Sequence, residues 1–195
     1  MARPRIVSDE DLVNATIRIM GRLGPVKMTL AAVAEEAGVT AATLVQRFGS
    51  KRALMLKIAA EAAGSGDACF EMVRAAHPGS PLAALIAAAA AMAQMAATPE
   101  ELANSLAFLQ IDITDPEFHV HTLALSKRNV AGYRALLKDA VAAGELAPHD
   151  TARMARAINA LAAGSLINWA IFREGTADKW VRRDIETLLA QYRRT

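Results

Sequence analysis

Residues 29–54 of the chain read TLAAVAEEAGVTAATLVQRFGSKRAL, and this stretch decides the fold of the N-terminal part. Gly38 separates two short runs of good helix formers and allows the positive φ angle of a tight turn. Thr40 stands directly before the second run, where its hydroxyl can cap a helix. Ala34 is small enough for the two helices to approach, and Leu44 can seal their crossing. This spacing predicts a helix-turn-helix.

The wider segment GPVKMTLAAVAEEAGVTAATLVQRFGSKRALM resembles the DNA-binding region of the TetR family of bacterial transcriptional regulators. The family pattern contains Thr-Leu or Thr-Val, Val/Ile-Ala, Ala-Gly-Val-Ser/Thr, Thr-Leu-Tyr and Ser/Asn-Lys-Glu-Leu, in this order. The matching positions are Thr29, Val33-Ala34, Ala37-Gly38-Val39, Thr43-Leu44, Phe48 and Ser50-Lys51. The resemblance covers about residues 8–58 and implies an all-α protein with a DNA-binding head and a larger helical body.

In helix-turn-helix proteins the second helix lies in the major groove of DNA. Its exposed positions are predicted to be Thr40, Ala41, Ala42, Thr43, Val45, Gln46 and Arg47. Glutamine can read adenine and arginine can read guanine, while the methyl groups of Ala41, Ala42 and Val45 can touch thymine. The resemblance implies that Thr29, Thr43 and Lys51 contact phosphates, although helix capping accounts for Thr29 equally well.

Val45 departs from the family pattern, which usually has a phosphate-contacting tyrosine at this position. Gln46 and Arg47 replace a frequent aromatic residue or histidine, and Arg47 could compensate for the lost contact. The departure leaves an alternative open, in which the chain is a helical dimeric ligand-binding protein whose head no longer reads DNA. Binding to DNA that falls steeply with salt would argue against this alternative.

The distribution of charge favours a basic head. Residues 1–60 carry nine Lys/Arg and five Asp/Glu, a net charge of +4, whereas residues 61–195 carry thirteen and fifteen, a net charge of −2. A basic segment beside a near-neutral body is typical of a nucleic-acid face. Uneven surface charge without function explains the same counts.

Composition and the helix start and stop signals together predict an all-α fold of about nine helices. The chain has 195 residues, of which 53% are hydrophobic and 5% aromatic, and alanine, the best helix former, dominates the hydrophobic share. Expected helix starts lie at Ser8, Thr29, Thr40, Ser50, Ser80-Pro81, Thr98-Pro99, Asp115-Pro116, Asp150 and Thr176; expected ends lie at Gly24-Pro25, Gly144 and Gly175. Thr98 and Glu101 have the spacing of a capping box. We divide the chain into a helix-turn-helix domain, residues 1–55, and an effector-binding and dimerisation domain, residues 56–195.

The last two helices are the expected dimer interface. Apolar residues occur on every side of the predicted helix between Ala157 and Phe172, and such a helix must be covered all round. The resemblance implies that these two helices and their mates form a four-helix bundle in a homodimer. The alternative is a core helix buried within a monomer.

The middle helices, about residues 81–144, would enclose an effector pocket, as the resemblance implies. Candidate ligand-binding residues are Met92, Met95, Phe108, Leu109, Phe118, His121, Tyr133 and Trp169, although any one of them could be ordinary core. Their apolar character favours an uncharged or amphipathic small molecule.

Several classes of function are excluded by residues that the chain lacks. Its single cysteine, Cys69, rules out a disulfide framework and suggests the cytoplasm. No phosphate-cradling glycine loop or Gly-x-Ser-x-Gly motif occurs, so we expect no enzyme activity and no cofactor or metal. The long uncharged runs, residues 81–98 and 157–172, fall short of a membrane span. We therefore predict a homodimeric repressor that binds a palindromic operator and is released by a small effector.

Overall fold

The computed structural model describes residues 7–194, the side chains at positions 66 and 95 excepted. Within this range the chain forms nine α-helices and two 3₁₀ helices, with no extended pairing except one bridge between Leu146 and Arg193. The prediction of an all-α fold is confirmed. The helices are α1 (Asp9–Lys27), α2 (Leu30–Ala37), α3 (Ala41–Phe48), α4 (Lys51–Ala76), α5 (Pro81–Ala90), η1 (Ala91–Met95), α6 (Pro99–Thr114), α7 (Pro116–Ala142), α8 (Thr151–Phe172), α9 (Ala177–Leu189) and η2 (Ala190–Tyr192).

Each α-helix begins at a serine, threonine or aspartate whose side chain accepts a backbone hydrogen bond. These caps satisfy donors that an uncapped first turn leaves unpaired. All the predicted caps are confirmed. The predicted capping box at Thr98 is only half present, because the Glu101 carboxylate accepts from the Ala97 N–H at 2.7 Å and not from the cap residue itself.

The predicted stop at Gly24-Pro25 is a break in α1 and not its end, since one further turn follows as far as Lys27. Gly24 has a φ of 68° and is buried. A Cβ at this position would lie 2.6 Å from the Asn104 Oδ1 atom of α6. The Asn104 amide also donates to the Gly21 carbonyl at 2.7 Å. A glycine is therefore needed both for the turn and for the close approach of α6.

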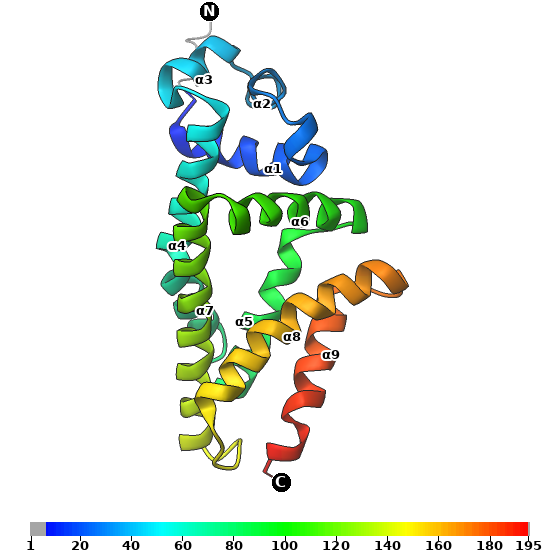
Figure 1. Cartoon of the computed structure of the whole chain (residues 1–195). Coiled ribbons are helices and arrows are strands. Elements are labelled where there is room, and N and C mark those ends of the chain that lie inside the picture. Colours follow the sequence, from blue (N-terminus) through cyan, green and yellow to red (C-terminus); the bar gives the residue numbers. More distant parts are fainter. Residues whose placement is uncertain (1–6, 195) are drawn as a thin grey trace, which may run out of the picture.

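Figure 1 shows α1, α2 and α3 at one end of the molecule and α6 lying across the chain between this head and the remaining helices. Helix α4 starts in the head and continues along α7, so it crosses the domain boundary predicted after residue 55. The core beneath the head joins Leu12, Ile19 and Leu44 to Phe108 of α6 and Phe118 of α7. The head and the body thus share apolar packing as well as a helix.

The body is built around α5, α7, α8 and α9. Its core contains Leu85, Tyr133, Ile158 and Val181, all buried. No single helix in the described part of the chain is long and apolar enough to cross a membrane. The pair 81–94 and 99–114 passes that test only together, by length and composition, and is bent by 90°.

Candidate nucleic-acid interface

The two short helices of the head are joined by a turn whose geometry depends on one glycine. Gly38 adopts a φ of 67° and ends α2, and the Val39 N–H donates to the Ala34 carbonyl at 2.9 Å. A Cβ on Gly38 would meet nothing within 4 Å, so the positive φ angle alone selects glycine here. The predicted helix-turn-helix is confirmed in its turn and in both helices.

Helix α3 is anchored on one side and open on the other. Leu44 is fully buried, and Ala34 of α2 is 3% exposed at the same core. The opposite side of α3 presents Ala42, Val45 and Gln46 to solvent, while Ala41 and Thr43 are half-buried. Among residues 7–194 the Gln46 side chain has no hydrogen-bond partner. Of the base-reading positions predicted from the sequence, Ala42, Val45 and Gln46 are thus open to solvent on this side. We call the predicted set as a whole the α3 face: Thr40, Ala41, Ala42, Thr43, Val45, Gln46 and Arg47.

The start of α3 carries a pair of threonine hydroxyls. The Thr40 Oγ1 atom accepts from the Thr43 N–H at 3.2 Å, and the two hydroxyl oxygens lie 3.0 Å apart. In α2 the Thr29 Oγ1 atom accepts from the Ala32 N–H at 3.1 Å. All three threonines stand at helix N-termini, where backbone N–H groups and the helix dipole favour anions such as phosphate.

Arg47 is held within the head. Its guanidinium donates to the Val7 carbonyl at 2.6 Å and to the Asp9 carboxylate at 3.2 Å. These bonds fasten the end of α3 to the start of α1. A contact of Arg47 with DNA, as predicted from the sequence, would require this pairing to be shared or released.

Lys51 is also engaged. Its ammonium donates to the carbonyls of Pro25 and Met28, at 2.7 and 2.6 Å. These two carbonyls lie at the C-terminal end of α1, where backbone carbonyls lack helical partners and a lysine ammonium can satisfy them. The structure therefore gives Lys51 a role inside the head, and its predicted phosphate contact remains a prediction.

Most other basic side chains of the head are paired as well. Arg18 and Arg22 both hold Glu36, and their hydrogen bonds, that of Arg18 first, lower the pKa of this carboxyl. Lys27 differs, because it is exposed and no acidic side chain or carbonyl of residues 7–194 pairs with it. It precedes the capped start of α2 by two residues. Sequence reasoning missed this candidate phosphate contact, and its place before Thr29 was the available signal.

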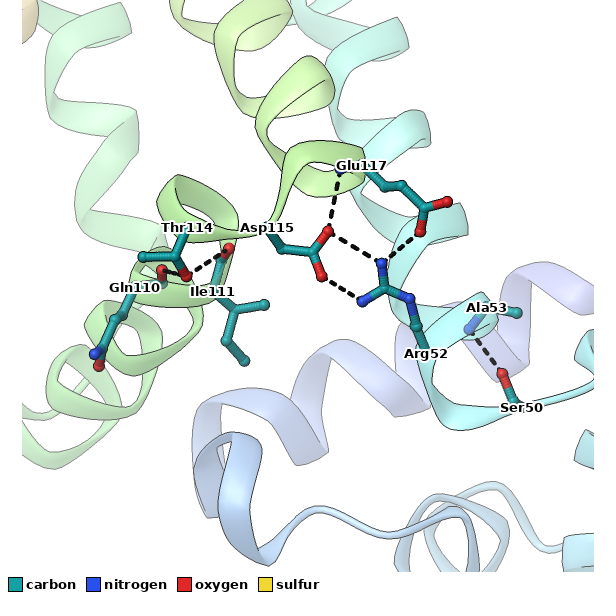
Figure 2. A network of polar contacts seen from close by, with 8 residues as sticks. All are labelled: Ser50, Arg52, Ala53, Gln110, Ile111, Thr114, Asp115 and Glu117. Carbon is teal, nitrogen blue, oxygen red and sulfur yellow. Dashed lines mark hydrogen bonds and ion pairs between the residues drawn. The ribbon is translucent and has the colours of Figure 1, made fainter.

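Arg52 joins the head to the body, as Figure 2 shows. Its guanidinium donates to the Asp115 carboxylate, with one N–O distance of 3.0 Å, and to Glu117. It also lies 5.2 Å from the centre of the Phe118 ring. The hydrogen bond from Arg52 lowers the pKa of Asp115. Sequence reasoning did not single out Arg52, because its partners lie more than sixty residues away.

The candidate effector residues lie in different parts of the molecule. Phe108 and Phe118 are part of the core beneath the head. Tyr133 is 2% exposed, packs edge-on against Phe70, and burial raises its pKa to about 12. Met92 packs on the body core, His121 is half-buried and Leu109 is exposed, while the side chain of Met95 lies outside the described residues. Their shared apolar character reflects separate packing sites.

Trp169 is the exception, because it lines a cavity of about 480 Å³ between the α5–η1 segment and the turn from α8 to α9.

The described residues contain no group of three His, Cys, Asp or Glu side chains that could hold a metal ion. The chemistry that the head offers is therefore hydrogen bonding and apolar contact from the α3 face, with cationic support from Lys27.

Comparison with known proteins places this head in a family. A family model described as bacterial regulatory proteins, tetR family, matches residues 12–58. The HTH-type transcriptional regulator BetI of Agrobacterium fabrum (strain C58) is 35% identical over 99 residues, which are 50% of this chain and 47% of BetI. The chain thus aligns with about half the length of this curated relative.

Solved structures share the fold over nearly the whole chain. The TetR-family regulator PfmR from Thermus thermophilus superposes with a TM-score of 0.62 at 24% identity and covers 100% of both chains. The regulator FadR from Bacillus subtilis, solved in complex with stearoyl-CoA, gives a TM-score of 0.67 at 13% identity, with 94% of this chain and 98% of FadR covered. These similarities show a common all-α architecture.

The matched segment begins in α1 and ends in α4, so it contains the turn at Gly38 and the α3 face. The relatives named above are regulators and not enzymes, as the sequence predicts for this chain. Residues 12–58, which contain the whole helix-turn-helix, match the TetR family of bacterial regulatory proteins.

Proposed function

We propose that the chain is a homodimeric repressor that binds a palindromic operator through its two heads and releases it when a small effector binds the body. The observation that carries this proposal is the α3 face. Leu44 is buried in the core and holds α3 from the opposite side. The short side chains of Ala41, Ala42 and Val45 would allow α3 to lie close to the bases in the major groove. Gln46 has the chemistry to read adenine, and the methyls of Ala42 and Val45 can meet thymine.

The dimer is supported by an uncovered apolar side of α8. Ile167, Ile171 and Phe172 are 41%, 69% and 59% exposed, although the other side of α8 is buried in the core. Ala160 and Gly164 precede them at helical spacing and allow another helix to come close. We call these residues the α8 face: Ala157, Ala160, Gly164, Ile167, Ile171 and Phe172. Two copies paired on this face would present two heads to half-sites roughly one helical turn, about 34 Å, apart.

Effector response is supported by the position of α6. One side of this helix contacts the head through Asn104 and Phe108. The opposite side, at helical spacing, carries Leu106, Leu109 and Ile113, which are 38%, 39% and 61% exposed. A molecule bound in the body could therefore act on the same helix that holds the head. FadR, solved with stearoyl-CoA, is a structural relative that binds an amphipathic molecule.

The test is selection of random duplex DNA on the purified chain, at two salt concentrations. We expect an enriched palindrome and an affinity that falls as the salt concentration rises. Basic side chains that bind phosphates release counterions from the DNA, and this release is less favourable at high salt. Gln46→Ala should weaken binding to the selected sequence by roughly tenfold or more, since a paired contact to a base contributes about 1–3 kcal/mol. Gln191→Ala, at the other end of the molecule, is the matched control and should change nothing.

A second candidate is favoured by one observation: Arg47 and Lys51, two of the predicted DNA contacts, are bound within the head. In this case the chain is a helical dimer that binds a ligand and no operator. The selection separates the two, because a folded dimer that enriches no sequence would overturn the repressor. Val45→Tyr, which restores the family's usual residue, should raise DNA affinity if the head binds DNA and have no effect if it does not.

A further inference from the structure

The cavity of about 480 Å³ beside Trp169 has the dimensions of a small-molecule site, since ligand pockets occupy roughly 300–1,000 Å³. Half of its lining residues are alanines, among them Ala87 of α5 and Ala91 and Ala93 of η1. Alanine side chains leave space and expose only methyl groups. The walls therefore suit an apolar molecule and offer it few hydrogen bonds.

Trp169 is one of the residues that line this cavity. It is only 6% exposed, and its indole N–H donates to the Gly175 carbonyl at 3.3 Å. This bond joins the ring to the turn between α8 and α9, which also borders the cavity. The ring is thus fixed in position before any ligand arrives, so little ordering of this side chain would accompany binding.

Arg182 supplies a charged group on the same cavity. Its Nε atom donates to the Asp178 carboxylate at 2.9 Å, and its side chain is 42% exposed. In the described chain its two Nη groups have no partner. A guanidinium can hold a carboxylate with two parallel hydrogen bonds. A dianion such as phosphate is less suited, because the negative charge of Asp178 lies beside it.

We propose that this cavity binds a small molecule with an apolar body and one carboxylate, the body lying against the alanines and Trp169 and the carboxylate on the Nη groups of Arg182. The binding site stands on its own geometry. Only the identification of its ligand with the effector rests on the proposed function. The site adds a polar anchor that the sequence analysis did not find, since Arg182 and η1 come together only in the fold.

The position of η1 explains how binding of such a ligand in the cavity would affect the head. This 3₁₀ segment joins α5 to the start of α6, and short 3₁₀ stretches often mark hinges. Its residues Ala91 and Ala93 line the cavity, while Asn104, two turns into α6, contacts α1 at Gly21. A ligand that fills the cavity therefore presses on the segment that positions α6.

Binding can be measured without DNA through tryptophan fluorescence. The chain has two tryptophans, so Trp180→Phe leaves Trp169 as the sole reporter. The probes are octanoate and 3-phenylpropanoate, each compared with its primary amide. We expect saturable changes in Trp169 emission with the acids, and affinities for the amides weaker by about tenfold or more, as loss of a charged hydrogen bond predicts.

Two adjacent arginines give a matched pair of variants. Arg182→Gln should weaken acid binding by about tenfold and bring it to the level of the amide. Arg183→Gln should leave it unchanged, because Arg183 lies over the Trp180 ring and does not line this cavity. Ala93→Leu should reduce binding of acid and amide alike by filling the space. The proposal is overturned if neither acid binds, if amides bind as tightly, or if the two arginine variants behave alike.

A gel-shift titration with the selected operator then separates this inference from the proposed function. Loss of operator binding on addition of the acid, abolished by Arg182→Gln, would make the cavity the effector site. Saturable binding with no change at the operator would keep the site and reject its role as the effector site. If the protein binds no DNA, its proposed role as a repressor is rejected. The fluorescence titration would still show whether the cavity binds the acid.

Discussion

The head and the body are built from the same kind of capped helix, but their decisive contacts differ in range. In the head the turn at Gly38, the cap at Thr40 and the anchor at Leu44 all lie within seven residues of one another. In the body the cavity brings the α5–η1 segment together with the α8–α9 segment, and these two segments lie far apart along the chain. Short-range contacts leave a readable pattern in a sequence, whereas long-range ones do not.

The two regions are nevertheless joined in three ways. They share helix α4, the core that contains Phe108 and Phe118, and the ion pairs of Arg52. A head that is locally specified is therefore not independent in stability. We therefore predict that a substitution in the core of the head will also lower the stability of the body.

The largest effect is expected from Leu44→Ala. Leu44 is fully buried, and loss of its side chain should lower the free energy of unfolding by about 2–5 kcal/mol. DNA binding should be lost with it, since this residue holds the α3 face in place. The free energy of unfolding is measured by urea unfolding, followed by circular dichroism, which reports all helices, and by tryptophan fluorescence, which reports only the body. A gel shift with the selected operator measures DNA binding.

The two signals should move together to lower urea, because the head and the body share a core. An early transition seen only by circular dichroism would show that the head unfolds alone. Ala42→Ser, on the exposed side of α3, is the control and should leave the urea midpoint nearly unchanged.

The second effect concerns the exposed side of the body. Ile171→Glu places a charge on the α8 face, where pairing with a second copy would bury it without a partner. The dimer should weaken by roughly a hundredfold, as about 3 kcal/mol predicts. Sedimentation equilibrium measures this change.

Operator affinity should fall in parallel with dimerisation, whereas the free energy of unfolding of the monomer should hardly change. Met72→Glu is a suitable control, because Met72 is also exposed but lies on α4. Equal weakening of the dimer by both variants would place the interface elsewhere.

The contrast between the regions also explains what could be predicted from the sequence. All nine α-helices and their caps were predictable, because a serine, threonine or aspartate before a run of helix formers is a local signal. The α3 face followed from the spacing of Gly38 and Leu44. The contacts of Arg47 with Val7 and Asp9 could not be predicted from the sequence, since these partners lie about forty residues away along the chain.

The candidate effector set shows the limit most clearly. Phe108, Phe118 and Tyr133 have the composition of a ligand pocket, but they pack into two different cores. Apolar composition does not distinguish a residue that lines a cavity from one that fills a core. The cavity itself depends on alanines, which carry no chemical signal in a chain so rich in them.

The third effect tests the close contact between α1 and α6. Gly24 and Gly38 have nearly the same φ, 68° and 67°, but only at Gly24 would an added methyl group meet a neighbour, the Asn104 Oδ1 atom at 2.6 Å. Alanine at Gly38, with φ 67° and ψ 32°, should cost roughly 1–2 kcal/mol through the left-handed backbone. Alanine at Gly24, with φ 68° and ψ 175°, should cost about 1–3 kcal/mol through the backbone alone, because this region is essentially confined to glycine. Gly24→Ala should cost about 1–3 kcal/mol more through overpacking.

Asn104→Ala in combination with Gly24→Ala makes the argument sharper, because it removes the clash and leaves the backbone strain. The double variant should recover part of the difference between the two glycine variants in urea unfolding. If Gly24→Ala and Gly38→Ala are equally stable, the contact between α6 and the head is looser than the structure indicates.

The smallest effect is the dependence of stability on pH at the joint around Arg52. The hydrogen bond from Arg52 lowers the pKa of Asp115 in the folded state below its ordinary value of 3.8. The folded state therefore favours the ionised carboxylate. This stabilisation is present above about pH 4 and is lost as the pH falls through the folded pKa. Asp115→Asn should be less stable than the native chain at pH 7, and the difference should shrink towards pH 3.

Asparagine is the right substitution here, because it can still cap α7 and so removes the charge without removing the cap. Glu36→Gln provides the comparison within the head, since the pKa of Glu36 is also lowered, by Arg18 and Arg22. The arginines of both ion pairs are exposed, so added salt should weaken both effects. If the pairing of Arg52 holds the head to the body, only Asp115→Asn should also change the response of operator binding to a ligand. Equal responses in the two variants would limit the role of Arg52 to stability.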